Sequence, residues 1–247
     1  MTVMTPVIRL DDKVVLITGA AGGQGRAHAA LAHALGARLV LTDVDRVGVE
    51  ALAESFPGAL GLEHDVSSGG AWRAVVDAAV SRFGRVDVLV NNAGYSPTGP
   101  FEDVEESTIR RALDINLVGP LLGMHAVLPA MRERGGSIVN IASTAALAGY
   151  ADRVPYAASK WGLRGASRSV AREYGLFGVR VNAICPGAVD TPMISEETRA
   201  GVGFIAGIPI PRAARPEEIS NLVVFLASDA SSYCTGQDFV IDGGVTA

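Results

Sequence analysis

The sequence has few of the features that mark secreted, membrane-spanning or nucleic-acid-binding proteins. It contains two cysteines, Cys185 and Cys234, in apolar or small-residue surroundings, where a reduced, buried thiol is expected. No uninterrupted apolar run reaches the roughly 18 residues of a membrane-spanning helix, and the chain does not begin with a basic segment followed by an apolar one. The net charge is −5, without a long run of either sign. We therefore expect a soluble, cytoplasmic protein with neither nucleic acid nor a membrane as a partner.

The sequence also lacks a recognisable metal site and a domain linker. The four histidines, His28, His33, His64 and His125, show no metal-ligand spacing, so we expect no bound metal. No linker, repeat or low-complexity tract divides the 247 residues, a length that one α/β domain can occupy. We expect a single domain over 1–247, with an irregular Gly- and Pro-rich lid at about 191–215 that covers a ligand site.

What the chain does contain is a series of short apolar, β-branched segments, most of them separated by residues with helical periodicity. Strands that are apolar on both faces belong to a parallel sheet with helices on both sides. We predict a doubly wound, Rossmann-type α/β fold with a seven-stranded, mostly parallel sheet. The predicted strands lie at about 13–19, 37–43, 59–65, 86–92, 136–143, 179–187 and 237–244.

A glycine-rich turn follows the first predicted strand. Gly19, Gly23 and Gly25 are spaced G-x-x-x-G-x-G and lead into a helical segment. Glycines let the backbone approach a pyrophosphate, and the N-terminus of the helix offers unpaired N–H groups to it. The turn therefore predicts a dinucleotide site, although taken alone it is also explained by a tight strand-to-helix connection.

Asp43 lies at the end of the second predicted strand, where a carboxylate can accept hydrogen bonds from the hydroxyls of a ribose. A 2′-phosphate would meet the negative charges of Asp43 and Asp45, and neither Ala20, Ala21 nor Val44 supplies a cation. The sequence therefore predicts NAD in preference to NADP. Asp43 could instead cap a helix, but Asp45 can take that role.

Ser143, Tyr156 and Lys160 are the candidate catalytic residues. Tyr156 and Lys160 lie one turn apart on one face of a helix predicted at about 156–175, and Ser143 ends the fifth predicted strand. The pKa of a phenol is about 10, and a neighbouring ammonium lowers it. We expect Lys160 to lower the pKa of Tyr156, and Ser143 to donate to a carbonyl oxygen. Alone, such a Tyr–Lys pair is a common surface feature.

Taken together, these motifs resemble the short-chain dehydrogenase/reductase family over essentially the whole chain, from Lys13 to Gly244. The resemblance implies an oxidoreductase in which a nicotinamide dinucleotide carries the hydride. The matching positions are Thr18 to Gly25, Asp65 with Val66, Asn91 to Gly94, Asn116, Ser143, Tyr156, Lys160, Pro186 with Gly187, and Thr191.

The resemblance also implies roles for these motifs. The Asp-Val pair would contact adenine, the NNAG motif the adenosine ribose side, and the Pro-Gly motif with Thr191 the nicotinamide, while Lys160 would also hold the nicotinamide ribose. Gln24 departs from the family, which usually has an apolar residue there. The expected cofactor-binding residues are Gly19, Gly23, Gln24, Gly25, Asp43, Val44, Asp65, Val66, Asn92, Ala93, Gly94, Tyr156, Lys160, Pro186, Gly187, Val189 and Thr191.

Asn116 completes the expected catalytic set. The resemblance places it in a long helix, where its main-chain carbonyl would hold a water that links the lysine to solvent. Pro120 follows four residues later and has no N–H to bond that carbonyl. We hypothesise that Gly119 and Pro120 open a helix predicted at roughly 105–134 and keep Asn116 available to a proton relay. The alternative is a kink that only lets the helix curve around the core.

Three loops should surround the reacting carbon, and they are mostly small or apolar. Such a lining suits a hydrophobic secondary alcohol or ketone, with a steroid-like compound as one option. Arg153 is the one charged loop residue that could select a polar substituent, and a solvated side chain is the alternative. The expected substrate residues are Tyr95, Ser143, Tyr150, Met193 and Phe204, with Leu147 and Ile205 as further wall residues.

Within the family, several segments look most like bacterial 3α/20β-hydroxysteroid dehydrogenases and NAD-dependent secondary alcohol dehydrogenases. A 3-oxoacyl-[acyl-carrier-protein] reductase is the alternative, although its usual NADPH preference fits poorly with Asp43. It would need a basic surface such as Arg132, Arg134, Arg168 and Arg172. A non-catalytic dinucleotide-binding sensor is a remote alternative. The resemblance further implies a homotetramer, with a homodimer as the other option.

Overall fold

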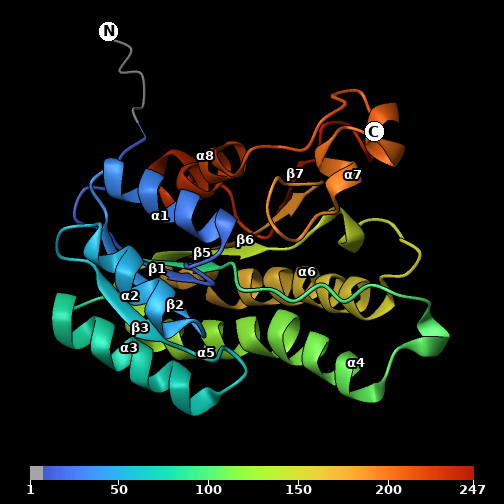
Figure 1. Cartoon of the computed structure of the whole chain (residues 1–247). Helices are drawn as coiled ribbons and strands as arrows, with labels where there is room; N and C mark the ends of the chain where they lie inside the picture. Colours follow the sequence, from blue (N-terminus) through green and yellow to red (C-terminus); the bar gives the residue numbers. More distant parts are fainter. Residues whose placement is uncertain (1–7) are drawn as a thin grey trace, which may run out of the picture.

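The computed structural model describes residues 8–247, arranged as a sheet between two layers of helices (Figure 1). The part of the predicted domain before residue 8, and with it the start of the chain, lies outside the described residues. The strands are β1 (Val14–Thr18), β2 (Arg38–Asp43), β3 (Leu60–Glu63), β4 (Val88–Asn91), β5 (Gly136–Ile141), β6 (Val179–Pro186) and β7 (Asp238–Ile241). The helices are α1 (Gly23–Ala34), α2 (Arg46–Glu54), α3 (Gly69–Phe83), α4 (Glu106–Leu113), α5 (Gly119–Met131), α6 (Val154–Tyr174), α7 (Glu196–Arg199) and α8 (Pro216–Ala227).

The seven strands form one sheet in the order β3-β2-β1-β4-β5-β6-β7, and all neighbouring strands are parallel. The predicted doubly wound fold is confirmed, with each predicted strand present. The strand order reverses between β1 and β4, so the loops after these two strands diverge. In such sheets this point leaves a crevice for a ligand at the carboxyl edge.

Apolar side chains on both faces of the strands fix the two helical layers. In β1, Val15 and Ile17 pack toward α1, α2 and α8, while Val14 and Leu16 pack toward α3 and α5. Helices α1 and α8 lie side by side on their face of the sheet (Figure 1). Burial on both faces explains why the strands are apolar without alternation.

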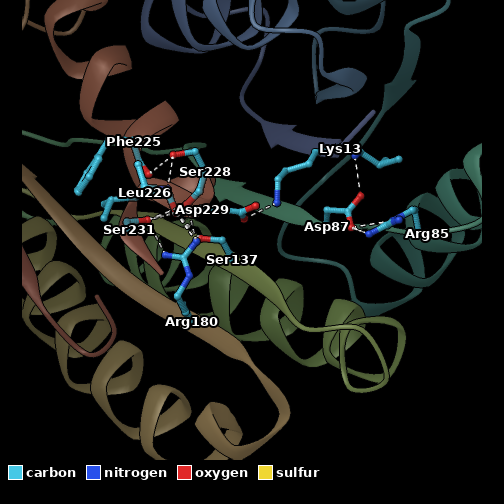
Figure 2. Close-up of polar contacts among 12 residues, drawn as sticks. Lys13, Arg85, Asp87, Ser137, Arg180, Phe225, Leu226, Ser228, Asp229 and Ser231 are labelled. Atoms are coloured by element: carbon cyan, nitrogen blue, oxygen red, sulfur yellow. Dashed lines mark hydrogen bonds and ion pairs between the residues drawn. The ribbon is translucent and has the colours of Figure 1, made fainter. Parts of the chain in front are cut away.

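Polar groups close the amino edge of the sheet, opposite the predicted ligand site (Figure 2). Asp87 accepts the N–H of Val14 at 2.8 Å and pairs with Arg85. Arg180 donates to the carbonyls of Leu226 and Ser228 at 2.9 and 3.1 Å, which satisfies the end of α8. Hydrogen bonds and ion pairs within the chain therefore stabilise this edge.

The helix predicted at roughly 105–134 is interrupted, as the Gly-Pro pair suggested. Between α4 and α5, residues Asp114–Val118 form a π-helical segment, and the N–H of Gly119 bonds the carbonyl of Asp114, five residues earlier. Pro120 follows directly and cannot donate a backbone hydrogen bond. The segment brings Asn116, which is buried, to the carboxyl edge of the sheet.

By length and composition alone, one helical stretch of the described chain, Glu106–Met131, could cross a membrane. In the structure its α5 part packs against the sheet through buried residues that include Met124, Val127 and Met131. A core helix passes the same test of length and hydropathy.

Candidate active site

The glycine-rich turn joins β1 to α1 where backbone segments approach closely. Gly19 has a φ of 63°, and a Cβ there would lie 2.8 Å from the Cα of Ala93. A Cβ on Gly25 would lie 2.2 Å from the carbonyl oxygen of Gly19. No side chain caps the first turn of α1, whose N-cap is Gly22. These features leave the start of the helix open to an anionic group.

A cavity of about 390 Å³ lies beside this turn, and we call it the nucleotide-side cavity. It brings together the turn, the end of β2 and the segments after β3 and β4. Of the expected cofactor-binding residues, it is lined by Gly19, Gly23, Gln24, Gly25, Asp43, Val44, Asp65, Val66, Asn92, Ala93, Gly94 and Thr191.

Asp43 holds the turn as well as lining this cavity. Its carboxylate accepts the N–H of Ala21 at 2.9 Å and the N–H of Asp45 at 3.0 Å. Asp45 caps α2 by accepting the N–H of Gly48 at 3.0 Å. The helix-capping role therefore belongs to Asp45, as expected, while the bond from Asp43 to the glycine-rich turn was not foreseen from the sequence.

Thr18 and Asn92 connect β1 and β4 across the crevice. The side-chain amide of Asn92 donates to the carbonyls of Thr18 and Gly19 at 2.9 and 3.0 Å. The hydroxyl of Thr18 accepts the N–H groups of Asn92 and Ala93 at 3.0 and 3.1 Å. The NNAG motif thus supports the shape of the glycine-rich turn.

A second cavity of about 530 Å³, which we call the substrate-side cavity, adjoins the first. The two share Gln24, Asn92, Gly94, Thr191 and Met193, so they form one trough along the carboxyl edge of the sheet. The residues expected at catalysis and at nicotinamide that line the second cavity are Ser143, Tyr156, Lys160, Pro186, Gly187, Val189 and Thr191.

Ser143, Tyr156 and Lys160 converge in this cavity. The hydroxyl oxygen of Ser143 accepts the N–H of Ala145 at 3.1 Å, which leaves its proton free for another acceptor. The Nζ of Lys160 donates to the carbonyl of Ile141 at 2.7 Å and lies 5.6 Å from the centre of the Tyr156 ring. Helix α6 presents the phenol and the ammonium one turn apart.

Burial controls the protonation of both groups. It raises the pKa of Tyr156 above its ordinary value, an effect that the Ser143 hydroxyl and the charge of Arg153 oppose. Burial also lowers the pKa of Lys160 to about 8. The expected lowering of the Tyr156 pKa by Lys160 is therefore not found. Removal of the phenol from water outweighs the neighbouring charges.

Asn116 fixes the loop after β4. Its side-chain oxygen accepts the N–H of Tyr95 at 2.8 Å, and its amide donates to the carbonyl of Tyr95 at 2.7 Å. A Cβ on Gly94 would lie 3.5 Å from the side-chain oxygen of Asn116 and 4.0 Å from the Nζ of Lys160. These polar groups therefore meet beside Gly94.

The segment expected as a lid, 191–215, is tied at its base. The N–H of Asp190 donates to the carbonyl of Ala214 at 2.8 Å, and the N–H of Ala214 donates to the carbonyl of Ala188 at 2.9 Å. Between these ties lie α7 and a short 3₁₀ turn, Gly203–Gly207. Met193 and Phe204 from this segment line the substrate-side cavity.

The other expected substrate residues are distributed differently. Tyr150 lines the substrate-side cavity, and its hydroxyl donates to that of Thr144 at 3.2 Å. Tyr95 lines the nucleotide-side cavity. Ile205 is fully buried in the core, and Leu147 packs against a small cluster that includes Ala146.

Several lining residues were missed from the sequence. Ser96, Ser195, Thr198 and Val245 line the substrate-side cavity, and His64 and Arg111 line the nucleotide-side cavity. Most of them follow a strand or lie in the loops already singled out. The rule that ligands bind at the carboxyl edge could therefore have found their neighbourhoods, although not their side chains.

The trough fits a nicotinamide dinucleotide. The side-chain oxygen of Gln24, at the junction of the two cavities, is buried and has no partner among residues 8–247. The open start of α1 suits a pyrophosphate, and Asp43 suits ribose hydroxyls. When bound, such a cofactor supplies or accepts the hydride.

The chain's own residues supply the remaining chemistry. Ser143 can donate its free proton to the oxygen of an alcohol or ketone, which stabilises negative charge on that oxygen. Tyr156 can give a proton to the same oxygen during reduction or take one during oxidation. Lys160 provides positive charge beside the phenol and polar contact for a ribose. This arrangement suits hydride transfer at a carbinol or carbonyl carbon.

The family model described as Enoyl-(Acyl carrier protein) reductase matches residues 19–246. The chain belongs to the short-chain dehydrogenase/reductase family. The trans-4-hydroxycyclohexanecarboxylate dehydrogenase of Sinomonas cyclohexanicum is 45% identical, covering 97% of this chain and 95% of the relative. The 3-alpha-(or 20-beta)-hydroxysteroid dehydrogenase of Mycobacterium bovis is 45% identical, covering 97% of this chain and 91% of the relative.

A solved structure supports the same family assignment. The crystal structure of levodione reductase superposes with a TM-score of 0.89 at 39% identity, covering 95% of this chain and 98% of that one. These relatives are dehydrogenases and reductases by name. The family resemblance drawn from the motifs is therefore confirmed over nearly the whole chain.

Proposed function

We propose that this protein transfers a hydride between NAD(H) and a hydrophobic secondary alcohol or the corresponding ketone. The observation that carries the proposal is the convergence of Ser143, Tyr156 and Lys160 on a largely apolar cavity that continues into the nucleotide-side cavity. Relatives named for a hydroxycyclohexanecarboxylate and a hydroxysteroid support cyclic secondary alcohols as the substrate class.

The preference for NAD rests on charge. Asp43 lines the nucleotide-side cavity and would repel a 2′-phosphate. Arg111 is the only lysine or arginine among the described residues that line this cavity. Its guanidinium lies over the ring of Tyr95, 4.8 Å from the ring centre. Because Arg111 is engaged in this contact, it is a weak candidate for binding the 2′-phosphate of NADP.

The alternative activity, reduction of 3-oxoacyl thioesters on a carrier protein, is represented among the relatives. Two of the four arginines that it would need are occupied within the chain. Arg168 pairs with Asp238, and Arg132 lies over the ring of Phe177 at 4.4 Å. This leaves less free basic surface for an acidic carrier protein.

The proposal includes a single domain with a lid at about 191–215, in a homotetrameric protein of the cytoplasm. Exposed apolar side chains on the π-helical segment, α5 and α6 support association through these helices, since such groups gain from burial. They are Val118, Leu121 and Trp161, exposed by 37%, 39% and 48%. Light scattering of the purified protein tests the assembly.

The function is tested with the purified protein, NADH or NADPH, and a panel of cyclic ketones, steroid ketones and acetoacetyl thioesters. We expect turnover of a cyclic ketone with NADH. Tyr156→Phe should lower kcat at least ~100-fold while the dissociation constant for NADH stays within about threefold, because the variant keeps the ring. Preferred use of the thioester with NADPH would favour the alternative. A wild-type protein that binds NADH but reduces nothing in the panel would support the sensor.

A further inference from the structure

The charge on the wall of the substrate-side cavity is entirely positive. Arg153 and Lys160 are its charged side chains, and no Asp or Glu of the described chain lines it. Lys160 already bonds the carbonyl of Ile141 beside the phenol of Tyr156. The proton chemistry at Ser143 and Tyr156 assigns the second cation, Arg153, no contact with substrate.

The guanidinium of Arg153 has spare donors. It is half-buried, and its Nη1 donates to the hydroxyl of Ser96 at 2.6 Å. The ion pairs of residues 8–247 do not include Arg153. A guanidinium has five N–H donors in a fork that matches a carboxylate. One neutral hydroxyl therefore leaves most of this fork free for a ligand.

The position of Arg153 is unfavourable for a cation that serves only the fold. Arg153 is the N-cap residue of α6, and its side chain makes no capping bond. The dipole of a helix disfavours positive charge at its N-terminus. A bound anion would relieve both this repulsion and the partial desolvation of the guanidinium.

The backbone next to Arg153 adopts a left-handed conformation. Asp152, which precedes it, has a φ of 60°, in the left-handed region. Its carbonyl accepts the N–H of Gly99 at 3.1 Å, and Arg153 reaches Ser96 in the same loop. These two bonds fix the guanidinium between the loop after β4 and the start of α6. Such backbone outliers concentrate at ligand sites.

Arg153 lies close to the reacting end of the cavity, because it lines the same cavity as Tyr156 and precedes it by three residues at the start of α6. Elsewhere the wall is largely small or apolar, with Ala151, Met193 and Phe204 among its residues. The cavity therefore joins a proton donor, a nearby cation and an apolar surface. A ligand complementary to all three has a secondary alcohol or ketone, an anionic group and an apolar body.

We propose that the substrate is a compact hydroxy- or oxo-carboxylate with an apolar skeleton, and that Arg153 binds its carboxylate. The proposal rests on the proposed function, since it assigns the alcohol or ketone to Tyr156. A neutral steroid would leave the half-buried guanidinium without an anion, so this assignment selects against it.

The test compares a cyclohexanol bearing a ring carboxylate with the same ring bearing a carboxamide, both with NAD⁺. The wild-type kcat/KM should favour the carboxylate at least ~10-fold. Arg153→Gln keeps a donor for Ser96 but removes the charge, and should lower the carboxylate-to-carboxamide ratio about 10- to 100-fold, mainly through KM. Arg153→Lys restores the charge without the fork and should give an intermediate ratio.

Arg172→Gln is the matched control, because it removes an exposed positive charge from the last turn of the same helix. It should leave the ratio within about twofold, as expected for a screened surface charge. Calorimetry with NAD⁺ and unreactive cyclohexanecarboxylate measures the same contact without turnover. Binding should weaken at least ~10-fold in Arg153→Gln.

Two results would overturn the assignment of Arg153. One is a wild-type enzyme that oxidises the carboxamide as well as the carboxylate, and the other is an unchanged ratio in both Arg153 variants. In either case turnover continues, so the proposed function stands. A protein that reduces no ketone of the wider panel but binds cyclohexanecarboxylate through Arg153 would instead contradict the proposed function and retain the anion site.

Discussion

At the scale of single residues, Asp43 combines a proposed role in binding with a role in local structure. Its carboxylate is positioned by the N–H groups of Ala21 and Asp45, and it lines the nucleotide-side cavity. The bonds to these donors orient the oxygen atoms before a cofactor arrives. We therefore expect discrimination against a 2′-phosphate to depend on a carboxylate whose orientation these bonds fix.

Substitution of Asp43 should relax cofactor preference. Because the like charge is lost, we expect the ratio of NADPH to NADH dissociation constants to fall about 10- to 100-fold in Asp43→Asn, measured by nucleotide fluorescence. Asp43→Ala should show the same loss and also weaken NADH, since the bond to the turn disappears. Asp45→Asn keeps a capping side chain at α2 and should retain the wild-type ratio. An unchanged ratio in both Asp43 variants would refute this role.

The sequence could predict that Ser143, Tyr156 and Lys160 converge, because glycine spacing and the Tyr–Lys turn are local patterns. It could not predict that Arg153 meets Ser96, because that contact joins loops from two different strands. Nor could it predict the direction of the Tyr156 pKa, which depends on how fully the fold removes the phenol from water. Chemistry that depends on local spacing can thus be predicted from the sequence, whereas the burial of a side chain depends on the whole fold and cannot.

At the scale of elements, Arg164 connects three parts of the fold behind the active site. It lies on α6, one turn after Lys160, and donates to the carbonyl of Ala146 in the short turn that follows Ser143. It also pairs with Asp238 of β7 at 2.7 Å, and both of these side chains are largely buried. Arg164 therefore holds the Ser143 turn in place relative to α6 and β7.

Removal of this contact should disturb both stability and catalysis. Arg164→Met keeps the length of the side chain but leaves Asp238 buried without its main partner. We expect the free energy of unfolding in urea to fall by about 3 kcal/mol and kcat to fall roughly tenfold, with NADH affinity within about twofold.

Arg168→Met is the control for Arg164. Its side chain contacts the same carboxylate but is 56% exposed, so it should cost at most about 1 kcal/mol. Equal effects of the two substitutions would mean that the ion pair, and not the hold on the Ser143 turn, accounts for the loss.

The interrupted helix illustrates what can be foreseen about an element. Pro120 indicated an opening, because its missing N–H is visible in the sequence. The π-helical form of Asp114–Val118 was not predictable. It depends on packing of the segment against α4 and α6, and such packing is set by the whole fold.

At the scale of the molecule, two buried histidines couple stability to pH. Burial lowers the pKa of His28 to about 3 and that of His64 to about 4. The pKa of a histidine in the unfolded chain is about 6.5. Between about pH 4 and 6.5 the unfolded chain therefore binds more protons than the folded one. Stability should therefore rise with pH across this window and be lost on acidification.

Urea unfolding between pH 7.5 and 4.5 measures this effect. Each histidine should contribute up to about 1.4 kcal/mol per pH unit near the acid end. His64→Asn should reduce the slope by about half, whereas His125→Asn, at an exposed position, should not alter it. Arg212 lowers the pKa of Glu218 to about 2. The stability that this carboxylate contributes is therefore lost at lower pH than the stability linked to the histidines. Constant stability from pH 7.5 to 4.5 would contradict the prediction.

The base of the segment 191–215 has a consequence for how this fold can diversify. The chain leaves the end of β6 and returns beside it just before α8, where Val189 and Ala214 form an isolated bridge. An excursion with joined ends can be exchanged for another of different length and composition without moving the strands beneath it. The trough can thus stay constant while the segment beside the substrate-side cavity is replaced. We expect relatives with different substrates to differ in this segment.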